Sequence, residues 1–223
     1  MTKAAAQQRR TQDERSSAMR ERLLEATIGC LVEYGYTGTT VTRIAERAGV
    51  TRGAQVHHYR TKDDLVTAAV AHLAGRSAEF GWARVAAVAE APDTVGSLLD
   101  VLWELHKGPT FTATVELWVA ARTDGELRAK VGSVEPVLLS SLHDVADRAA
   151  GVGLSPDVID DELLDAVYTA MDAMRGLMIS IWHLPACPRT ARWRRARERL
   201  RLLFPPTEQV RQSLDKATAA LAG

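Results

Sequence analysis

Apolar residues recur at every third or fourth position along most of this chain, and this spacing restricts the possible folds more than any other feature. It is the period of an α-helix that buries one face, whereas a half-buried strand alternates at every second position. Leu23, Ala26 and Cys30 form one such stripe, and Gly35 follows as a natural helix end. No stretch of the sequence has a strand pattern. We therefore predict an all-α fold.

Two short helical patterns follow this first helix. Thr40 stands before VTRIAERA at 41–48, Gly49 comes after it, and Thr51 can cap another short helix. Threonine is a favoured residue directly before a helix because its hydroxyl accepts a hydrogen bond from a free backbone amide. Two short helices joined by a tight turn and preceded by a longer helix predict a helix-turn-helix unit. Thr61 with Asp64 then predicts the start of a long fourth helix that runs towards residue 92.

Three parts of the chain follow from these patterns. We predict a flexible basic arm at 1–14, a helix-turn-helix domain at 15–62, and a helical regulatory and dimerisation domain at 63–223, with the long helix as the connection. In the last part, a stripe between 127 and 149 contains Pro136 as a kink or break. The segment 160–184 is apolar on more than one face, which predicts contact with its own domain and with a second copy of the chain. We place a homodimer interface at about 160–204.

The formal net charge of zero hides an uneven distribution. Residues 1–60 hold ten Lys and Arg against six Asp and Glu, a net of +4, so residues 61–223 hold eighteen against twenty-two, a net of −4. The amino-terminal quarter is therefore the part that attracts a polyanion. Cys30 and Cys187 are far apart, which disfavours a disulfide scaffold, and no signal peptide or membrane span is present. These features predict a cytoplasmic protein with no membrane partner.

The stretch TRGAQVHHYRTKDDL at 51–65 is the best candidate for a functional surface. On a short helix that begins near Arg52, we expect Arg52, Gln55 and one of the two histidines to be exposed, and such side chains read base edges in the major groove. The small residues of 53–54 allow a close approach to DNA. Lys62 and the amino end of the fourth helix are suited to hold phosphates.

Metal binding and catalysis are the alternative interpretations of this stretch. His57 and His58 are adjacent and point about 100° apart on a helix, so they form a poor chelate. Asp63 and Asp64 are the nearest carboxylates, and capping of the next helix already explains them. A structural role for one of the two histidines remains open. We predict DNA contact, with no catalytic residue, no metal ligand and no cofactor.

The segment from Tyr34 to Leu65 resembles the amino-terminal signature of the tetracycline-repressor (TetR) family of bacterial regulators. That signature has an aromatic residue and glycine at the end of helix one, a Thr-Val-x-x-Ile-Ala core, Ala-Gly-Val with Ser or Thr, a glycine, a His-aromatic pair and Lys-x-x-Leu. The residues that carry it here are Tyr34, Gly35, Thr40, Val41, Ile44, Ala45, Ala48, Gly49, Val50, Thr51, Gly53, His58, Tyr59, Lys62 and Leu65. The resemblance covers about the first 65 residues.

The resemblance implies a homodimeric, all-helical repressor that binds a palindromic operator and is released by a small ligand. It implies base contacts for Thr42, Arg52, Gly53 and Ala54, and phosphate contacts for Thr40, His57, His58 and Lys62. It also places Tyr59 in an aromatic core position. Val56 departs from the family, which usually has a tyrosine there, and can at most touch a thymine methyl. The complete predicted DNA-binding set is Thr40, Thr42, Thr51, Arg52, Gly53, Ala54, Gln55, His57, His58 and Lys62.

The regulatory half offers large or adaptable apolar side chains, with a few polar ones, as candidates to line a cavity for a small, partly apolar effector. They are Trp82, Trp103, His106, Phe111, Trp118, Met171, Met174, Arg175, Met178 and Trp182. Each of them can equally be an ordinary core residue, because they follow helical spacing.

The sequence is also compatible with other functions. An enzyme needs a convergent acid, base or nucleophile, which this half of the chain does not present at suitable spacing. A non-specific DNA-binding or scaffold protein without ligand control is the main alternative to a regulator. The basic run at 191–204 suits an ordinary amphipathic helix better than a nucleic-acid or membrane surface.

Overall fold

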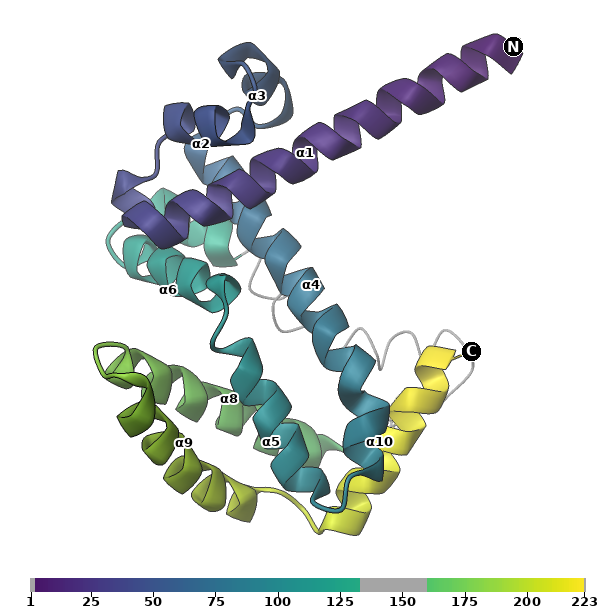
Figure 1. The fold of residues 1–223 in the computed structure, drawn as a ribbon, viewed down its shortest axis with the longest axis vertical. Helices are drawn as coiled ribbons and strands as arrows, with labels where there is room; N and C mark the ends of the chain where they lie inside the picture. Colours follow the sequence, from purple (N-terminus) through teal and green to yellow (C-terminus); the bar gives the residue numbers. More distant parts are fainter. Residues whose placement is uncertain (1–2, 133–159, 223) are drawn as a thin grey trace. The chain divides into compact units, whose positions relative to one another are not determined.

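The computed structural model describes residues 3–132 and 160–222, and every regular element in these ranges is a helix, which confirms the predicted all-α class. The described residues form two compact units (Figure 1). Unit 1 contains residues 3–74 and 109–132, and unit 2 contains residues 75–108 and 160–222. The predicted boundary between residues 62 and 63 does not coincide with this division. The kink predicted at Pro136 lies outside the described residues.

Helix α1 (Lys3–Gly38) is the first element of unit 1. It begins at Lys3, so residues 3–14, which we predicted as a flexible arm, are helical. The predicted stop at Gly35 is confirmed, because the backbone leaves the helical conformation there, with φ 65° and ψ 179°. This positive φ is accessible to glycine at little cost. One further turn then leads to Gly38.

Capping interactions define the next three helices, α2 (Val41–Ala48), α3 (Arg52–His58) and α4 (Lys62–Glu90). The Thr40 hydroxyl accepts a hydrogen bond from the Arg43 amide, and the Thr51 hydroxyl accepts one from the Ala54 amide, each at 3.3 Å. Gly49 ends α2 in the left-handed conformation, with φ 63° and ψ 39°. These contacts confirm the predicted helix-turn-helix boundaries.

The start of α4 has the reciprocal contacts of a capping box. The Asp64 amide donates to the Thr61 hydroxyl at 3.0 Å, and the Thr61 amide donates to the Asp64 carboxylate at 3.2 Å. The helix runs to Glu90, close to the predicted end near residue 92.

Two hydrophobic clusters hold unit 1 together, and α1 contributes to both. The first cluster joins α1, α2 and the beginning of α4, and its buried members are Leu23, Leu24, Ala26, Ile28, Cys30, Ile44, Ala48, Leu65, Ala69 and Leu73. The second joins α1 and α4 to α6 (Pro109–Ala121) and to residues 125–132; its buried members are Leu31, Val66, Val70, Ala113, Leu117, Ala121, Leu127 and Val131. Helix α1 therefore holds the helix-turn-helix on one side and α6 on the other.

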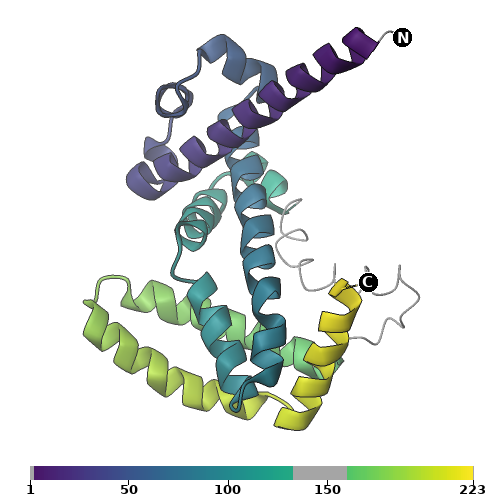
Figure 2. The same ribbon diagram turned by 45° about the vertical axis from the view of Figure 1, so that its right-hand side comes forward.

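Unit 2 is built around α5 (Thr94–Leu105), which packs against α8 (Asp161–Ile181), α9 (Ala186–Leu200) and α10 (Thr207–Ala222), as can be followed in Figure 2. A short 3-10 helix, η2 (Arg201–Leu203), continues α9. Trp103 of α5 stacks on Trp193 of α9, with ring centroids 4.4 Å apart and planes within 1° of parallel. Trp193 and Leu200 are buried on one side of α9, so this basic helix is amphipathic, as predicted.

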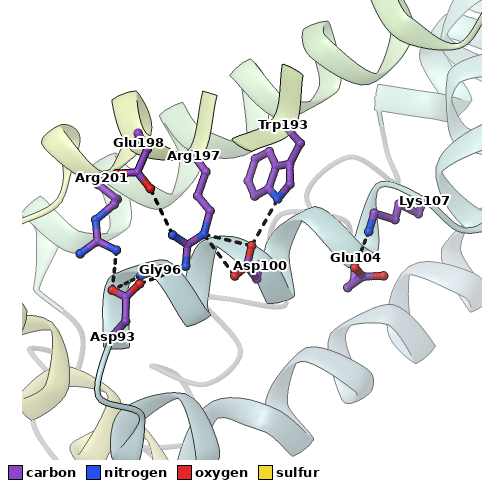
Figure 3. A network of polar contacts seen from close by, with 9 residues as sticks. All are labelled: Asp93, Gly96, Asp100, Glu104, Lys107, Trp193, Arg197, Glu198 and Arg201. Atoms are coloured by element: carbon purple, nitrogen blue, oxygen red, sulfur yellow. Dashed lines mark hydrogen bonds and ion pairs between the residues drawn. The ribbon is translucent and has the colours of Figure 1, made fainter. Parts of the chain in front are cut away.

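A polar network fixes α9 and η2 to the beginning of α5 (Figure 3). The Arg197 guanidinium donates to the carboxylates of Asp93 and Asp100, at 3.0 and 3.1 Å. Arg201 donates to the other oxygen of Asp93 at 2.5 Å, and the Trp193 indole N–H donates to Asp100 at 3.2 Å. Charge-assisted contacts from one guanidinium to two carboxylates restrict both the distance and the rotation between the helices.

Helix α10 holds the end of α4 in the same unit. The Arg211 side chain donates to the Ala89 carbonyl at 2.9 Å and to the Thr94 hydroxyl at 3.1 Å. The last carbonyl groups of a helix lack partners within it, so the arginine supplies a missing donor there. No helix among the described residues is long and apolar enough to cross a membrane.

We predict that Arg197→Ala lowers the free energy of unfolding by about 1 kcal/mol, because it removes partly exposed ion pairs to two carboxylates. Thermal or urea unfolding measures the change, and 0.5 M NaCl should reduce it by screening. Arg194→Ala, at an exposed position of the same helix, is the matched control. Equal losses for the two variants would contradict the role of the network.

Candidate nucleic-acid interface

The helix-turn-helix of unit 1 presents most of the predicted DNA-binding residues at the surface. Thr40 and Thr42 of the α2 region are exposed. At the beginning of α3, residues 51–53 are exposed, and Ala54 is half-buried. His57 is exposed and His58 is half-buried at the end of α3. The exposed surface of this short helix thus carries an arginine, a glycine and a histidine, which suits the edge of a major groove.

Gln55 is the exception, and its expected exposure is wrong. Its side chain is fully buried, and its amide nitrogen donates to the Tyr59 carbonyl at 2.6 Å. The Tyr59 amide in turn donates to the Gln55 carbonyl at 2.9 Å. Gln55 therefore closes the carboxy-terminal end of α3 from inside, where the last carbonyl groups need donors. It is a structural residue and is not available to adenine in this conformation.

Val56 takes the surface position that lies beside the buried glutamine. Its side chain is 46% exposed. An exposed valine offers only an apolar contact, such as that with a thymine methyl group. The polar residue of this pair is thus inside and the apolar residue outside.

Two of the basic residues in α2 are used within the protein. Arg47 forms an ion pair with Glu33 of α1 at 2.6 Å and lies across Gly29, where an added Cβ would be 2.5 Å from the guanidinium Nε. Arg43 donates to the Gly38 carbonyl and lies 4.7 Å from the Tyr34 ring centroid. Both side chains hold α2 to α1.

His57 and His58 lie in an edge-to-face arrangement, with ring centroids 5.5 Å apart. Burial lowers the pKa of His58, and the nearby His57 and Arg20 lower this pKa further. The neutral imidazole is therefore favoured in the free protein. A phosphate beside His58 would oppose these effects, because a negative charge favours the protonated form.

Two basic residues were absent from the predicted set. Arg60 is exposed directly after α3, and Arg20 is exposed on α1, where its charge also acts on Tyr59. The position of Arg60 next to the recognition helix could have indicated it. Arg20 is distant in the sequence, so only the packing of α1 brings it to this surface.

Lys62, a predicted phosphate contact, is half-buried at the beginning of α4. Its ammonium group donates to the Tyr36 carbonyl at 2.9 Å and lies 3.7 Å from the centroid of the Tyr36 ring.

Tyr59, the predicted aromatic core residue, packs against the first cluster. That prediction is confirmed.

The predicted effector-binding residues fall in both units. In unit 2, Trp103, His106, Met174 and Met178 are buried, and the His106 Nδ1 lies 2.8 Å from the Leu102 carbonyl. The remaining predicted residues of this unit are the half-buried Met171 and Arg175 and the 39% exposed Trp182. Phe111 and Trp118 belong to unit 1. The side chain of Trp82 lies outside the described residues.

Comparisons with known proteins agree with this architecture. Residues 23–69 match the family described as "Bacterial regulatory proteins, tetR family". The HTH-type transcriptional regulator CymR of Pseudomonas putida is 32% identical over 175 residues, which cover 78% of this chain and 85% of CymR. The HTH-type transcriptional repressor AcnR of Corynebacterium diphtheriae is 29% identical over 164 residues, which cover 74% of this chain and 80% of AcnR. The crystal structure of the multidrug binding protein EbrR complexed with imidazole matches with a TM-score of 0.53 at 25% identity. The match covers 84% of this chain and 95% of the EbrR chain.

Together with these relatives, the helix-turn-helix and its exposed recognition helix define a DNA-binding transcriptional regulator. The chain belongs to the TetR family. Among the described residues, no group of three or more His, Cys, Asp or Glu side chains is arranged to hold a metal ion.

We predict that His58→Gln reduces the loss of stability at acidic pH. Because the pKa of His58 is lowered in the folded protein, the unfolded chain binds the proton more readily, so the free energy of unfolding falls as the pH drops below about 6.5. Urea titrations of both proteins at pH 7.5 and 5.5 measure this. An equal loss in the variant and the wild type would contradict the prediction.

Proposed function

We propose that this protein is a ligand-released repressor that binds a palindromic operator as a homodimer. The observation that carries the DNA-binding part is the exposed side of α3, where Arg52, Gly53 and His57 lie on a helix that packs against α2. An arginine in this position can donate two hydrogen bonds to guanine, and the glycine allows a close approach. As a DNA-bound regulator of a bacterial family, the protein would act in the cytoplasm.

The homodimer would form through α8, α9 and η2. Large apolar side chains of α8 and η2 remain exposed, with Ile179 at 47%, Leu202 at 75% and Leu203 at 45%. Burial of such side chains against a second copy would remove apolar surface from water. A two-fold axis would also present two recognition helices to two successive half-sites, which is why a palindrome is expected.

The effector would bind in unit 2, where Trp103, Met174 and Met178 offer apolar contacts and His106 offers a polar one. A partly apolar small molecule fits such a set. The relative EbrR was crystallised with imidazole, which supports a small-molecule role. Release requires the effector to bind the DNA-incompetent form of the dimer more tightly than the competent form, because equal affinity shifts no equilibrium.

Selection of bound fragments from random-sequence DNA, at a stated salt concentration, is the first test. We expect an enriched palindrome whose half-sites are about one helical turn apart. Binding without any enrichment would favour a non-specific DNA-binding protein. A compound that raises the thermal stability of the free protein should then weaken binding to the selected operator, and DNA in turn should weaken binding of the compound by the same factor.

We predict that Arg52→Ala weakens operator binding by about 1–3 kcal/mol and relaxes the preference at one base pair in each half-site. Competition between the selected site and its single-base variants measures this. Gln55→Ala is the matched control on the same helix, because the buried side chain affects stability and not the ranking of sequences. An unchanged ranking for Arg52→Ala would contradict its assignment as a base contact.

A further inference from the structure

A hydrogen bond crosses from α6 to the bend in α1. The conformation of Gly35 turns the peptide group between Gly35 and Tyr36 out of the helical orientation, so the Tyr36 amide points away from the preceding turn. The Glu116 carboxylate of α6 accepts from this amide at 3.3 Å. A Cβ at Gly35 would lie 2.8 Å from the same carboxylate oxygen, so the close approach depends on glycine.

Tyr36 then contacts the beginning of α4 with its remaining polar groups. Its carbonyl and its ring both face the Lys62 ammonium, at 2.9 Å and 3.7 Å. Its hydroxyl donates to the Asp63 carboxylate at 2.5 Å. Burial is the main cause that raises the pKa of Tyr36, and the bond to Asp63 raises it further, so the hydroxyl keeps its proton. One residue thus joins α1, α6 and the first turn of α4.

Lys62 is one of the residues that we predict from the sequence to contact a DNA phosphate. An ammonium group has three donors, and the Tyr36 carbonyl uses one of them. The cation–π contact and the hydrogen bond limit the rotamers that the long side chain can adopt, which reduces the conformational entropy that a phosphate contact would cost. The ammonium group is thereby held near one position, beside the Tyr36 carbonyl and ring.

We propose that Glu116 is a positioning residue for DNA binding, which acts through Tyr36 to orient Lys62. This inference rests on the proposed function, because it requires that the protein binds DNA and that Lys62 contacts a phosphate of that DNA. It connects α6, which lies outside the helix-turn-helix in sequence, to a DNA contact.

The contacts around Asp64 make the proposal testable without unfolding the helix. Lys130 forms an ion pair with Asp64 at 3.1 Å, and the Thr61 capping box also holds the first turn of α4. These contacts do not involve Glu116. Alanine is also the most favourable helix residue, so Glu116→Ala should leave α6 folded.

A double-mutant cycle on operator affinity is the decisive experiment. We expect Glu116→Ala to weaken binding by about threefold to tenfold when Lys62 is present, and to have no further effect in a Lys62→Ala background. Glu116→Gln loses the same charge but keeps an acceptor oxygen, so it should bind as the wild type does. Equal effects of Glu116→Ala in both backgrounds, or no effect of Lys62→Ala, would overturn the proposal.

A second readout without DNA separates this proposal from the proposed function. Acetylation of Lys62 by an N-hydroxysuccinimide ester, relative to the exposed Lys216, should be faster in Glu116→Ala than in the wild type or in Glu116→Gln. If the wild type selects no DNA but this difference in acetylation is present, the proposed operator-binding repressor is rejected, and the contact from Glu116 through Tyr36 to Lys62 is retained. Equal acetylation rates in all three proteins would reject the positioning contact itself.

Discussion

The packing of α1 on two sides is the constraint on which unit 1 depends. Leu23 and Leu31 are both fully buried, but Leu23 belongs to the cluster with α2 and Leu31 to the cluster with α6. Two core leucines in different clusters mean that a shift of α1 would open one cluster or the other. Loss of a buried leucine side chain typically costs about 2–5 kcal/mol, so neither cluster can be given up. Because the recognition helix α3 packs against α2, and α2 packs against α1, the position of α1 also sets that of the recognition helix.

Polar side chains add directional contacts between the helices that the apolar clusters hold together. Arg47 spans α2 and α1, Gln55 closes α3 from inside, and Tyr36 joins the bend of α1 to the beginning of α4. Groups of this kind are directional, so they define angles that apolar packing leaves less certain. They also decide which polar residues remain for DNA. The polar side chains that can contact a polyanion are those that these internal contacts do not use.

In unit 2, apolar packing and directional polar contacts are likewise combined around the turn between α4 and α5. The Trp103–Trp193 stack supplies apolar contact between α5 and α9, and Arg197 supplies direction through Asp93 and Asp100. Arg211 holds the carbonyl groups at the end of α4. Arg197 and the exposed Arg194 belong to the same basic run, yet only Arg197 is described with this network, and charge count alone cannot distinguish the two.

The sequence by itself determined the helical class, the helix-turn-helix and its boundaries. Thr40, Gly49 and Thr51 act within three or four residues of their own positions, so their roles can be recognised from local order. The tertiary structure decided that Gln55 is buried and Val56 exposed, because the angular position of a residue on a seven-residue helix is set by the surface it packs against. It also decided that Lys62 contacts Tyr36 and that Glu116 contacts Tyr36 from α6. Such contacts join residues far apart in sequence, and only the packed clusters bring those residues within hydrogen-bonding distance.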